Sequence, residues 1–276
     1  MVTKRENHKW GMVVDLDRCT GCQACVVACQ AENNLPINTK EFFQQRRAYE
    51  WIRIERYWEG EFPNVKAKFI PILCQHCENA PCEPVCPVFA TYHNDEGLNV
   101  QVYNRCIGTR YCSVNCPYTV RFFNFWEPVW PERFRNQLNP DVTVRSRGIM
   151  EKCTFCVQRL RRGEVNVERR GLDPLTGQRI PAAERKLNYR HMKEGNYLPA
   201  CVQACPTNAL QFADQQDETG PVKEYFDEAN EQIETREHGG HVDEAHTRVY
   251  RLFEEVGTKP NVIYLKKVEP FPLEKA

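Results

Sequence analysis

The sequence lacks the features of a chain that crosses a membrane or carries its own export signal. No apolar run in its 276 residues approaches the length that a bilayer requires, and the mean hydropathy is −0.63. The first ten residues are polar and charged, without the apolar core or the twin arginine of an export signal. We therefore expect a peripheral protein that, if it works outside the cytoplasm, crosses the membrane folded on a partner with such a signal.

The sequence also lacks an excess of charge and any unassigned cysteine. Its 37 lysine and arginine residues balance 37 aspartate and glutamate residues, so nothing in it resembles a nucleic-acid-binding surface. All 15 cysteines fall within four short runs, which leaves none as a disulfide partner or a lone nucleophile. We therefore assign no catalytic residue.

Four closely spaced cysteine runs dominate what the sequence does contain. Three thiolates packed into one loop can reach three corners of an iron–sulfur cube, whereas zinc ribbons use two well-separated pairs. The spacing, C-x2-C-x2-C-x3-C in the first run, therefore favours iron bound in clusters over zinc. In chain order the runs are Cys19, Cys22, Cys25 and Cys29; Cys74, Cys77, Cys82 and Cys86; Cys106, Cys112 and Cys116; and Cys153, Cys156, Cys201 and Cys205.

The last cysteine of such a run ligates the neighbouring cluster in two-cluster ferredoxins. The second and third runs are joined by a predicted hairpin with its turn at 94–97, so they should form one two-cluster module. The first and fourth runs are then left to pair. The predicted ligand sets are Cys19, Cys22, Cys25 and Cys205; Cys29, Cys153, Cys156 and Cys201; Cys74, Cys77, Cys82 and Cys116; and Cys86, Cys106 and Cys112.

The third run has a threonine, Thr109, where its second cysteine belongs. A threonine hydroxyl has a far higher pKa than a thiol and is a poor ligand for iron. The cluster corner that faces Thr109 would lose its iron, which predicts one [3Fe–4S] cluster beside three [4Fe–4S] clusters. The alternatives are a labile [4Fe–4S] cluster with water or hydroxide at that corner, and a site that stays empty.

We expect an α+β fold in which one ferredoxin-like two-cluster module is inserted into another. The outer module covers 10–36 and 145–215, the inserted module 65–125, the insertion loop 157–200 and the partly helical C-terminal tail 216–276. Strands are expected at 11–17, 51–57, 65–73, 209–212 and 260–265, and helices at 25–31, 222–237 and 244–255.

The sequence has three further features: an aromatic segment, two histidines near the cysteine runs and a long polar segment. The aromatic segment 122–130 is either local core or a lid over a cluster, or else a docking surface for a membrane partner. His76 and His93 lie near predicted clusters, but the cysteines already fill the ligand shell, so we expect neither histidine to be a ligand. The polar segment 163–196 has turn signals and is predicted to be a loop that contacts a partner subunit.

Four runs in this order, with the fourth one split, resemble the four-cluster subunit of the complex iron–sulfur molybdoenzymes. That family includes polysulfide, dimethyl sulfoxide and nitrate reductases, and the resemblance covers roughly 10–212. In nitrate reductases the third run also lacks its second cysteine, but tryptophan stands there. Thr109, together with the segment 138–148 ahead of Cys153, is most similar to the iron–sulfur domain of alternative complex III, a quinol-oxidising complex.

The resemblance implies an electron-transfer subunit without a substrate pocket of its own. The clusters of the first, fourth, second and third runs would form an electron-transfer chain in that order. The implied partners are a large molybdopterin-enzyme-like subunit at the first-run end, a polytopic quinone-reactive membrane subunit at the third-run end, and heme c subunits. In the resembling complex the iron–sulfur domain is usually fused to its large partner, which we here expect to be a separate chain or absent.

The implied location is the periplasmic face of a membrane, with the cytoplasmic face as the alternative. Two rival functions remain at this point. One is the iron–sulfur subunit of a molybdopterin-dependent reductase of sulfur compounds such as polysulfide, thiosulfate or dimethyl sulfoxide. The other is a free polyferredoxin carrier.

Overall fold

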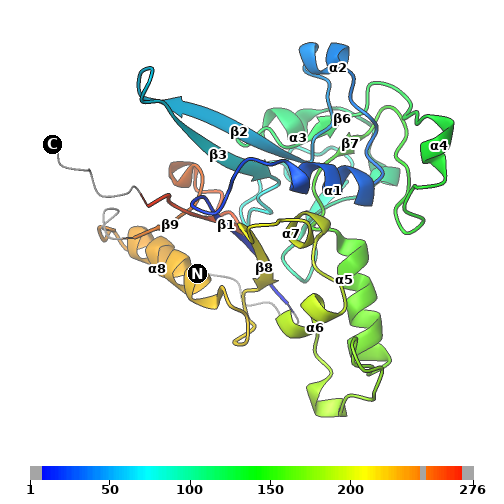
Figure 1. The fold of residues 1–276 in the computed structure, drawn as a ribbon, viewed down its shortest axis with the longest axis vertical. Coiled ribbons are helices and arrows are strands. Elements are labelled where there is room, and N and C mark those ends of the chain that lie inside the picture. Colours follow the sequence, from blue (N-terminus) through cyan, green and yellow to red (C-terminus); the bar gives the residue numbers. More distant parts are fainter. Residues whose placement is uncertain (1–7, 243–246, 269–276) are drawn as a thin grey trace.

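The computed structural model describes residues 8–242 and 247–268, in which short helices are mixed with small sheets (Figure 1). The strands are β1 Trp10–Asp15, β2 Ile52–Glu59, β3 Lys66–Leu73, β4 Thr91–His93, β5 Asn99–Gln101, β6 Phe122–Phe123, β7 Met150–Glu151, β8 Leu210–Asp214, β9 Val249–Tyr250 and β10 Val262–Leu265. The helices are α1 Ala24–Glu32, α2 Lys40–Gln44, α3 Tyr111–Val114, α4 Glu132–Arg135, α5 Val157–Glu164, α6 Tyr189–Glu194, α7 Ala200–Gln203 and α8 Lys223–Glu237.

A four-stranded sheet of order β8–β1–β10–β9 joins segments from both ends of the described chain (Figure 1). β1 runs antiparallel to β8 and parallel to β10. Every residue of β1 is buried, and its side chains alternate between the two faces of the sheet. Met12 and Val14 belong to the main core with the cysteines, whereas Val13 packs on the side of α8.

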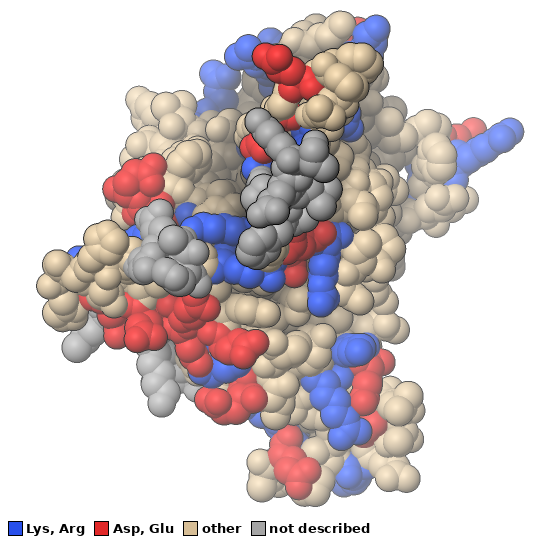
Figure 2. Space-filling model, turned by 60° about the vertical axis from the view of Figure 1, so that its left-hand side comes forward, with Lys and Arg blue, Asp and Glu red and all other residues tan. Residues whose placement is uncertain are grey.

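α8 covers one face of this sheet because its apolar residues recur at helical spacing. Val222, Phe226 and Ala229 are buried with Val13 in one small core. The outer face of the helix carries the exposed acidic residues Glu224, Asp227, Glu231 and Glu234. Figure 2 shows a patch of acidic side chains on this side of the molecule, with a band of basic ones next to it.

Most of the expected elements are confirmed. β2 pairs with β3, at the two strands expected at 51–57 and 65–73, and β4 pairs with β5 in the hairpin predicted at 94–97, both antiparallel. Strands β1, β8 and β10 and helices α1 and α8 also lie at the predicted places. The β2–β3 hairpin projects from the body of the molecule (Figure 1).

The helix expected at 244–255 is wrong for the part that the structure describes. Residues 247–256 contain β9 and a 3₁₀ turn at Glu254–Val256, while 243–246 lie outside the described residues. Val249 and Tyr250 pair with Leu265 and Tyr264 of β10. Pairing with the next strand, β10, therefore overrides the local helical pattern.

The segment predicted to be a loop at 163–196 is more regular than expected. α5 continues into a π-helical turn at Val165–Arg169, and α6 follows before the chain returns to the fourth run. The predicted turn is present at its centre, where Leu172 and Arg179 form an isolated bridge. Arg161 of α5, just before this segment, binds Glu96 at 2.6 Å and ties α5 to the β4–β5 hairpin.

Candidate iron–sulfur cluster sites

The first run wraps around a small cavity at the start of α1. Gly21 and Gln23 have φ angles of 71° and 63°, in the left-handed region, so the loop turns tightly before the helix begins. The cysteines that line this cavity are Cys19, Cys22 and Cys25 of the first run and Cys205 of the fourth. The structure therefore brings the last cysteine of the fourth run to the first.

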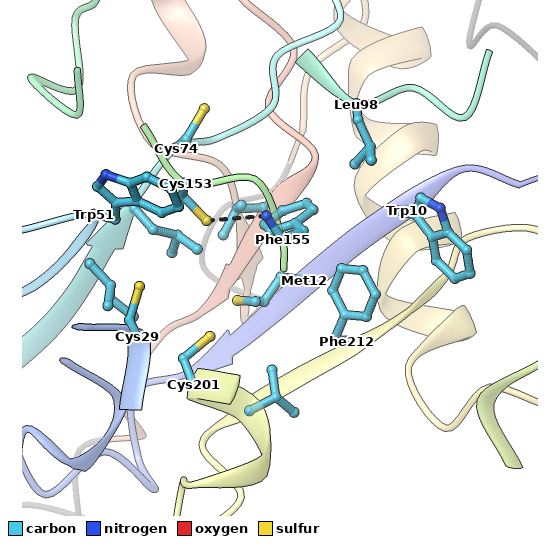
Figure 3. Close-up of a cluster of buried hydrophobic side chains, with 14 of the residues drawn as sticks. Trp10, Met12, Cys29, Trp51, Cys74, Leu98, Cys153, Phe155, Cys201 and Phe212 are labelled. Carbon is cyan, nitrogen blue, oxygen red and sulfur yellow. Dashed lines mark hydrogen bonds between the residues drawn. The ribbon is translucent and has the colours of Figure 1, made fainter. Parts of the chain in front are cut away.

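A second group of thiols lies deeper in the core. Cys29, Cys153 and Cys201 come from three separate segments, and their sulfur atoms point toward a shared space (Figure 3). Asn33 links this group to Cys156, since its Nδ2 donates to Sγ of Cys29 at 3.5 Å and to Sγ of Cys156 at 3.7 Å. The last cysteine of the first run thus lies among the thiols of the fourth.

The second and third runs exchange their last cysteines in the same way. Cys77 has its strongest thiol interactions with Cys74, Cys116 and Cys82, and together with burial these raise its pKa. Burial likewise raises the pKa of Cys112, whose thiol neighbours are Cys106 and Cys86. Cys116 therefore lies with the second run, and Cys86 with the third.

Thr109 lies in a loop shaped like that of the first run. Gly108 has a φ of 73° and Arg110 a φ of 63°, nearly the values of Gly21 and Gln23 at the matching positions. A short helix, α3, begins directly after Arg110. The side chain of Thr109 is exposed, as is that of Cys22 in the first run.

Thiols of neighbouring groups also lie close enough for their charges to interact. Cys201 of the fourth-run group interacts with Cys25 of the first-run group. Cys153 of the fourth-run group interacts with Cys74 of the second-run group. The second- and third-run groups belong to runs joined by the β4–β5 hairpin. The four groups are therefore adjacent in the order first, fourth, second, third.

Burial, with repulsion between neighbouring thiols, raises the pKa of ten of the cysteines and disfavours their thiolate form. The pKa values of Cys25 and Cys153 are raised to about 12, and that of Cys82 to about 11. Thiolate is the form that ligates iron, so thiols placed in this way need a positive centre among them. In the described residues no set of three or more His, Cys, Asp or Glu side chains is arranged around a single metal ion. A cluster is wider than an ion, and its ligands stand further apart.

Backbone N–H groups point at the cysteine sulfurs, which is the arrangement that stabilises and tunes a bound cluster. Such donors are found in the second, third and fourth runs. They are Ala90 N to Cys86 at 3.2 Å, Ala209 N to Cys205 at 3.2 Å, Met150 N to Cys106 at 3.4 Å, Phe155 N to Cys153 at 3.4 Å and Ala200 N to Cys156 at 3.5 Å. The donors and the grouped thiols together fit iron–sulfur clusters.

Both histidines near the runs contact groups other than cysteine sulfurs. His76 is fully buried, stacks on Phe155 and accepts a hydrogen bond from the N–H of Asn99 at 3.1 Å. Burial holds the pKa of His76 well below its usual value, so its ring is neutral. His93 pairs with Glu83 at 2.7 Å.

The aromatic segment 122–130 packs locally against the residues around α2. Trp126 stacks on Phe42 with ring centroids 3.7 Å apart, and Tyr49 accepts a hydrogen bond from the N–H of Phe125. Val129 remains 69% exposed. Much of the segment is therefore half-buried local packing.

Sequence reasoning missed the polar side chains that line the thiol groups. Asn33 donates to two sulfurs, and Asn99 Nδ2 lies 3.7 Å from Sγ of Cys82. Lys152 is fully buried, and its Nζ donates to the carbonyl oxygen of Cys153 at 2.7 Å. Only the position of Lys152 next to a cysteine could have drawn attention to it, since the two asparagines resemble ordinary helix-end and turn residues.

Two family models match the chain within the regions just described. One, described as a 4Fe-4S dicluster domain, matches residues 65–130, and the other, a 4Fe-4S binding domain, matches residues 10–31. The first spans the second and third runs, and the second spans the first run. Both support iron–sulfur binding by these cysteines.

Relatives match over almost the whole chain. The iron–sulfur cluster-binding subunit of menaquinone reductase from Nitratidesulfovibrio vulgaris is 38% identical over 95% of this chain and 90% of its own length. A putative iron–sulfur subunit of dimethyl sulfoxide reductase from Halobacterium salinarum is 32% identical over 93% and 78%. Iron–sulfur subunit 1 of the Hdr-like menaquinol oxidoreductase from Archaeoglobus fulgidus is 32% identical over 95% and 85%. The chain therefore belongs to the family of iron–sulfur electron-transfer subunits of molybdoenzyme-associated and menaquinone-linked oxidoreductases.

Proposed function

We propose that the chain is the electron-transfer subunit of a quinol-oxidising complex of the alternative complex III type. It would hold three [4Fe–4S] clusters and one [3Fe–4S] cluster, which when bound supply one-electron transfer. The chain itself supplies the thiolates, the N–H donors to sulfur and a largely buried setting. The proposed ligand sets are Cys19, Cys22, Cys25 and Cys205; Cys29, Cys153, Cys156 and Cys201; Cys74, Cys77, Cys82 and Cys116; and Cys86, Cys106 and Cys112.

The exchange of last cysteines between runs supports these sets. In each pair of runs, the last cysteine of one lies among the first thiols of the other. The same exchange supports two modules, one formed by 10–36 with 145–215 and the other by 65–125.

The observation that carries the proposal is Thr109 in the loop conformation of a ligand. Gly108 and Arg110 have nearly the φ angles of Gly21 and Gln23, which supports a position for the side chain of Thr109 that corresponds to that of Cys22. A hydroxyl there leaves one corner without a strong ligand. We infer a three-iron cluster at this site, although the matching family model is described by four-iron clusters.

Exposed apolar side chains surround the third run and support an interface at that end. Phe89, Ile107, Tyr111 and Val114 are each at least 60% exposed. Apolar side chains gathered in this way mark interaction surfaces. We assign this end to a polytopic quinone-reactive membrane subunit. The first-run group, at the other end of the series, would face a large molybdopterin-enzyme-like subunit, with heme c subunits on the acceptor side.

The chain would be held at the membrane by its partners. Among the described residues, no helix is both long and apolar enough to span a bilayer. We propose the periplasmic face, with the cytoplasmic face as the alternative. Protease added to intact spheroplasts should cleave the chain if it is periplasmic, and protection until lysis would indicate the cytoplasmic face.

Purification of the native complex from membranes tests the proposal as a whole. The expected preparation contains a large subunit, a polytopic subunit and heme c chains, with about fifteen iron atoms per copy of this chain. It should reduce an acceptor with menaquinol as the donor. Quantitative recovery as a soluble monomer would instead support the free carrier, and stoichiometric zinc with little iron would exclude both.

A second candidate function uses the same series of clusters differently. Electrons would either flow in the opposite direction, toward menaquinone, or flow from quinol to the catalytic subunit of a reductase. The 38% identical relative is named a menaquinone reductase, and the 32% identical ones include a putative dimethyl sulfoxide reductase subunit. A large partner that contains molybdenum, with electrons flowing from quinol to a sulfur compound, would support the reductase. Reduction of menaquinone by the complex, without oxidation of quinol, would support electron flow in the opposite direction.

A further inference from the structure

Arg121 is a buried cation without a carboxylate partner. Its side chain is 6% exposed and follows the last cysteine of the third run, just before β6. Its Nη1 donates to Thr91 Oγ1 at 3.2 Å and to Gln101 Oε1 at 2.9 Å, and its Nη2 donates to Asn99 Oδ1 at 2.7 Å. All three acceptors are neutral, and within 8–242 and 247–268 no ion pair to Asp or Glu involves Arg121. A buried charge is costly unless an opposite charge lies nearby.

The nearby opposite charges are cysteine thiolates from two different sites. Burial alone would lower the pKa of Arg121, but Cys82, Cys112, Cys74 and Cys116 reverse the effect and raise it. Three of these cysteines belong to the proposed second-run set, and Cys112 belongs to the third-run set. The contacts agree with this, because Arg121 Nη2 binds Asn99, whose Nδ2 lies 3.7 Å from Sγ of Cys82, and the side chain of Arg121 is a hydrogen-bond partner of Cys112. The guanidinium therefore lies close to thiols of both sites of the inserted module.

Arg251 shows what happens to an equally buried arginine without such neighbours. Its side chain is also 6% exposed, and its guanidinium binds the carbonyl oxygens of Pro260 and Ala229 and the side chain of Asn230. Burial lowers the pKa of Arg251 to about 10. The groups that oppose the effect of burial on Arg251 are Glu78 and Tyr118, whereas those that do so on Arg121 are cysteine thiols.

Given the ligand sets proposed above, we propose that Arg121 is a positioning residue that acts as a fixed counter-charge shared by the second-run and third-run cluster sites. It favours the more negative, reduced state of both sites and so keeps both reduction potentials higher than their thiolates alone would. Thr91, Asn99 and Gln101 hold the guanidinium between the β4–β5 hairpin and the thiols.

The physical reason is that reduction adds one negative charge to a site whose ligands are already anionic. A fixed cation in a poorly solvated setting stabilises that added charge more strongly than one in water would. Arginine stays protonated at any ordinary pH, so its effect does not vary with pH. A single cation between two sites must shift both in the same direction.

The sharpest test is Gln101→Glu, which places a carboxylate on the guanidinium without changing the size of the side chain. Gln101 Oε1 already accepts hydrogen bonds from Arg121 and, at 2.7 Å, from Thr91 Oγ1, so the carboxylate keeps both bonds. Neutralising the charge of Arg121 in this way should lower the equilibrium constant for one-electron reduction of both sites about tenfold. That change corresponds to a fall of about 59 mV in each reduction potential. The first-run and fourth-run sites should change less than twofold.

The measurement is a dithionite titration of the purified complex followed by electron paramagnetic resonance. The signals of the two sites are assigned as those altered by Cys82→Ser and by Cys112→Ser. Arg251→Met is the matched control and should leave all four potentials unchanged. Arg121→Lys keeps the charge and should stay within about threefold of the unsubstituted protein at both sites.

Each outcome of Gln101→Glu decides the matter. Unchanged potentials with full iron, or a shift at only one of the two sites, would overturn the shared counter-charge. Loss of iron from the second-run and third-run sites alone would support it, because both sites would have lost a stabilising cation. Loss from all four sites would count against it, since only two face Arg121. A four-iron third site would contradict the proposed cofactor content but leave the predicted shift unchanged.

Discussion

The loops of the first and third cysteine runs have nearly the same backbone and differ at the position where a ligand is expected. Gly21 and Gly108 have φ angles of 71° and 73°, and the residue two positions later has a φ of 63° in both loops. The first loop presents Cys22 and the third presents Thr109. The comparison teaches that two loops of similar conformation can differ at the candidate ligand position by one side chain.

The surroundings of the two loops differ as well. α1 has nine residues and buries Cys25, Val26 and Cys29, whereas α3 has four residues and buries only Cys112. A longer helix carries the chain of the first run deep into the core, to the fourth-run group. More apolar side chains are exposed around the third run, where they are Phe89, Ile107, Tyr111 and Val114, than in α1, where Val27 is exposed.

The largest expected effect on iron content comes from replacing the last cysteine of a run, which ligates the cluster of the other run in the same module. Cys86→Ser should abolish the third-run cluster, a loss of about three iron atoms, while the second-run cluster remains. Cys82→Ser, four residues earlier, is the matched change and should damage the second-run cluster instead. Iron analysis with electron paramagnetic resonance measures both. A Cys86→Ser protein that keeps its three-iron signal but loses a four-iron signal would refute the crossed pairing.

A smaller effect should follow when the first loop is made to resemble the third. Cys22→Thr removes one ligand from an otherwise intact site, so about one iron atom should be lost and a second three-iron signal should appear. The air-oxidised protein should then show twice the three-iron signal of the unsubstituted chain. If the first-run cluster is lost entirely instead, the likeness of the two loops does not extend to their chemistry.

Gly21→Ala and Gly108→Ala should lower the stability of the protein by unequal amounts. Alanine at either position has to adopt a positive φ, at a cost of about 1–2 kcal/mol. At Gly21 the new Cβ would meet the ring of Phe69, which can move, whereas at Gly108 it would meet the backbone oxygen of Gly148. We expect Gly108→Ala to lower the temperature of cluster loss, followed by visible absorbance, more than Gly21→Ala does. Equal shifts would mean that the backbone around Gly148 yields as easily as a side chain.

The smallest effect concerns the asparagines that follow the two helices. Asn33 donates to the sulfurs of Cys29 and Cys156, whereas Asn115 donates to the carbonyl oxygen of Tyr111 at 3.0 Å. Asn33→Leu should remove about 0.5–1.5 kcal/mol of stabilisation from the reduced fourth-run site and lower its potential. Asn115→Leu should leave every potential unchanged. A potential titration in which both variants behave alike would show that the contacts of Asn33 with sulfur carry no weight.

The sequence predicted the parts of this molecule that depend on short-range spacing. The cysteine runs, the β2–β3 hairpin and the amphipathic α8 all follow local periodicities, and the structure contains each of them where expected. β9 could not be predicted, because its two residues, Val249 and Tyr250, form a strand only by pairing with β10, and the residues around them follow a helical pattern.

The polar side chains around the thiols could not be predicted from the sequence either. Nothing in the local sequence separates the buried Arg121 from Arg105 and Arg110, which are exposed. What distinguishes Arg121 is its position between two groups of thiols, which is a property of the assembled module. Burial of this kind depends on contacts between segments and leaves little trace in a single sequence.

The most direct test of the central claim is Thr109→Cys, which gives the third loop the ligand pattern of the first. A thiolate at the open corner should bind a fourth iron, so the three-iron signal of the air-oxidised protein should vanish and the iron content should rise from about fifteen to about sixteen atoms per chain. Electron paramagnetic resonance and iron analysis of the same preparation measure both. A three-iron signal that persists at full intensity in the variant would contradict the claim, because something other than Thr109 would then keep that corner empty.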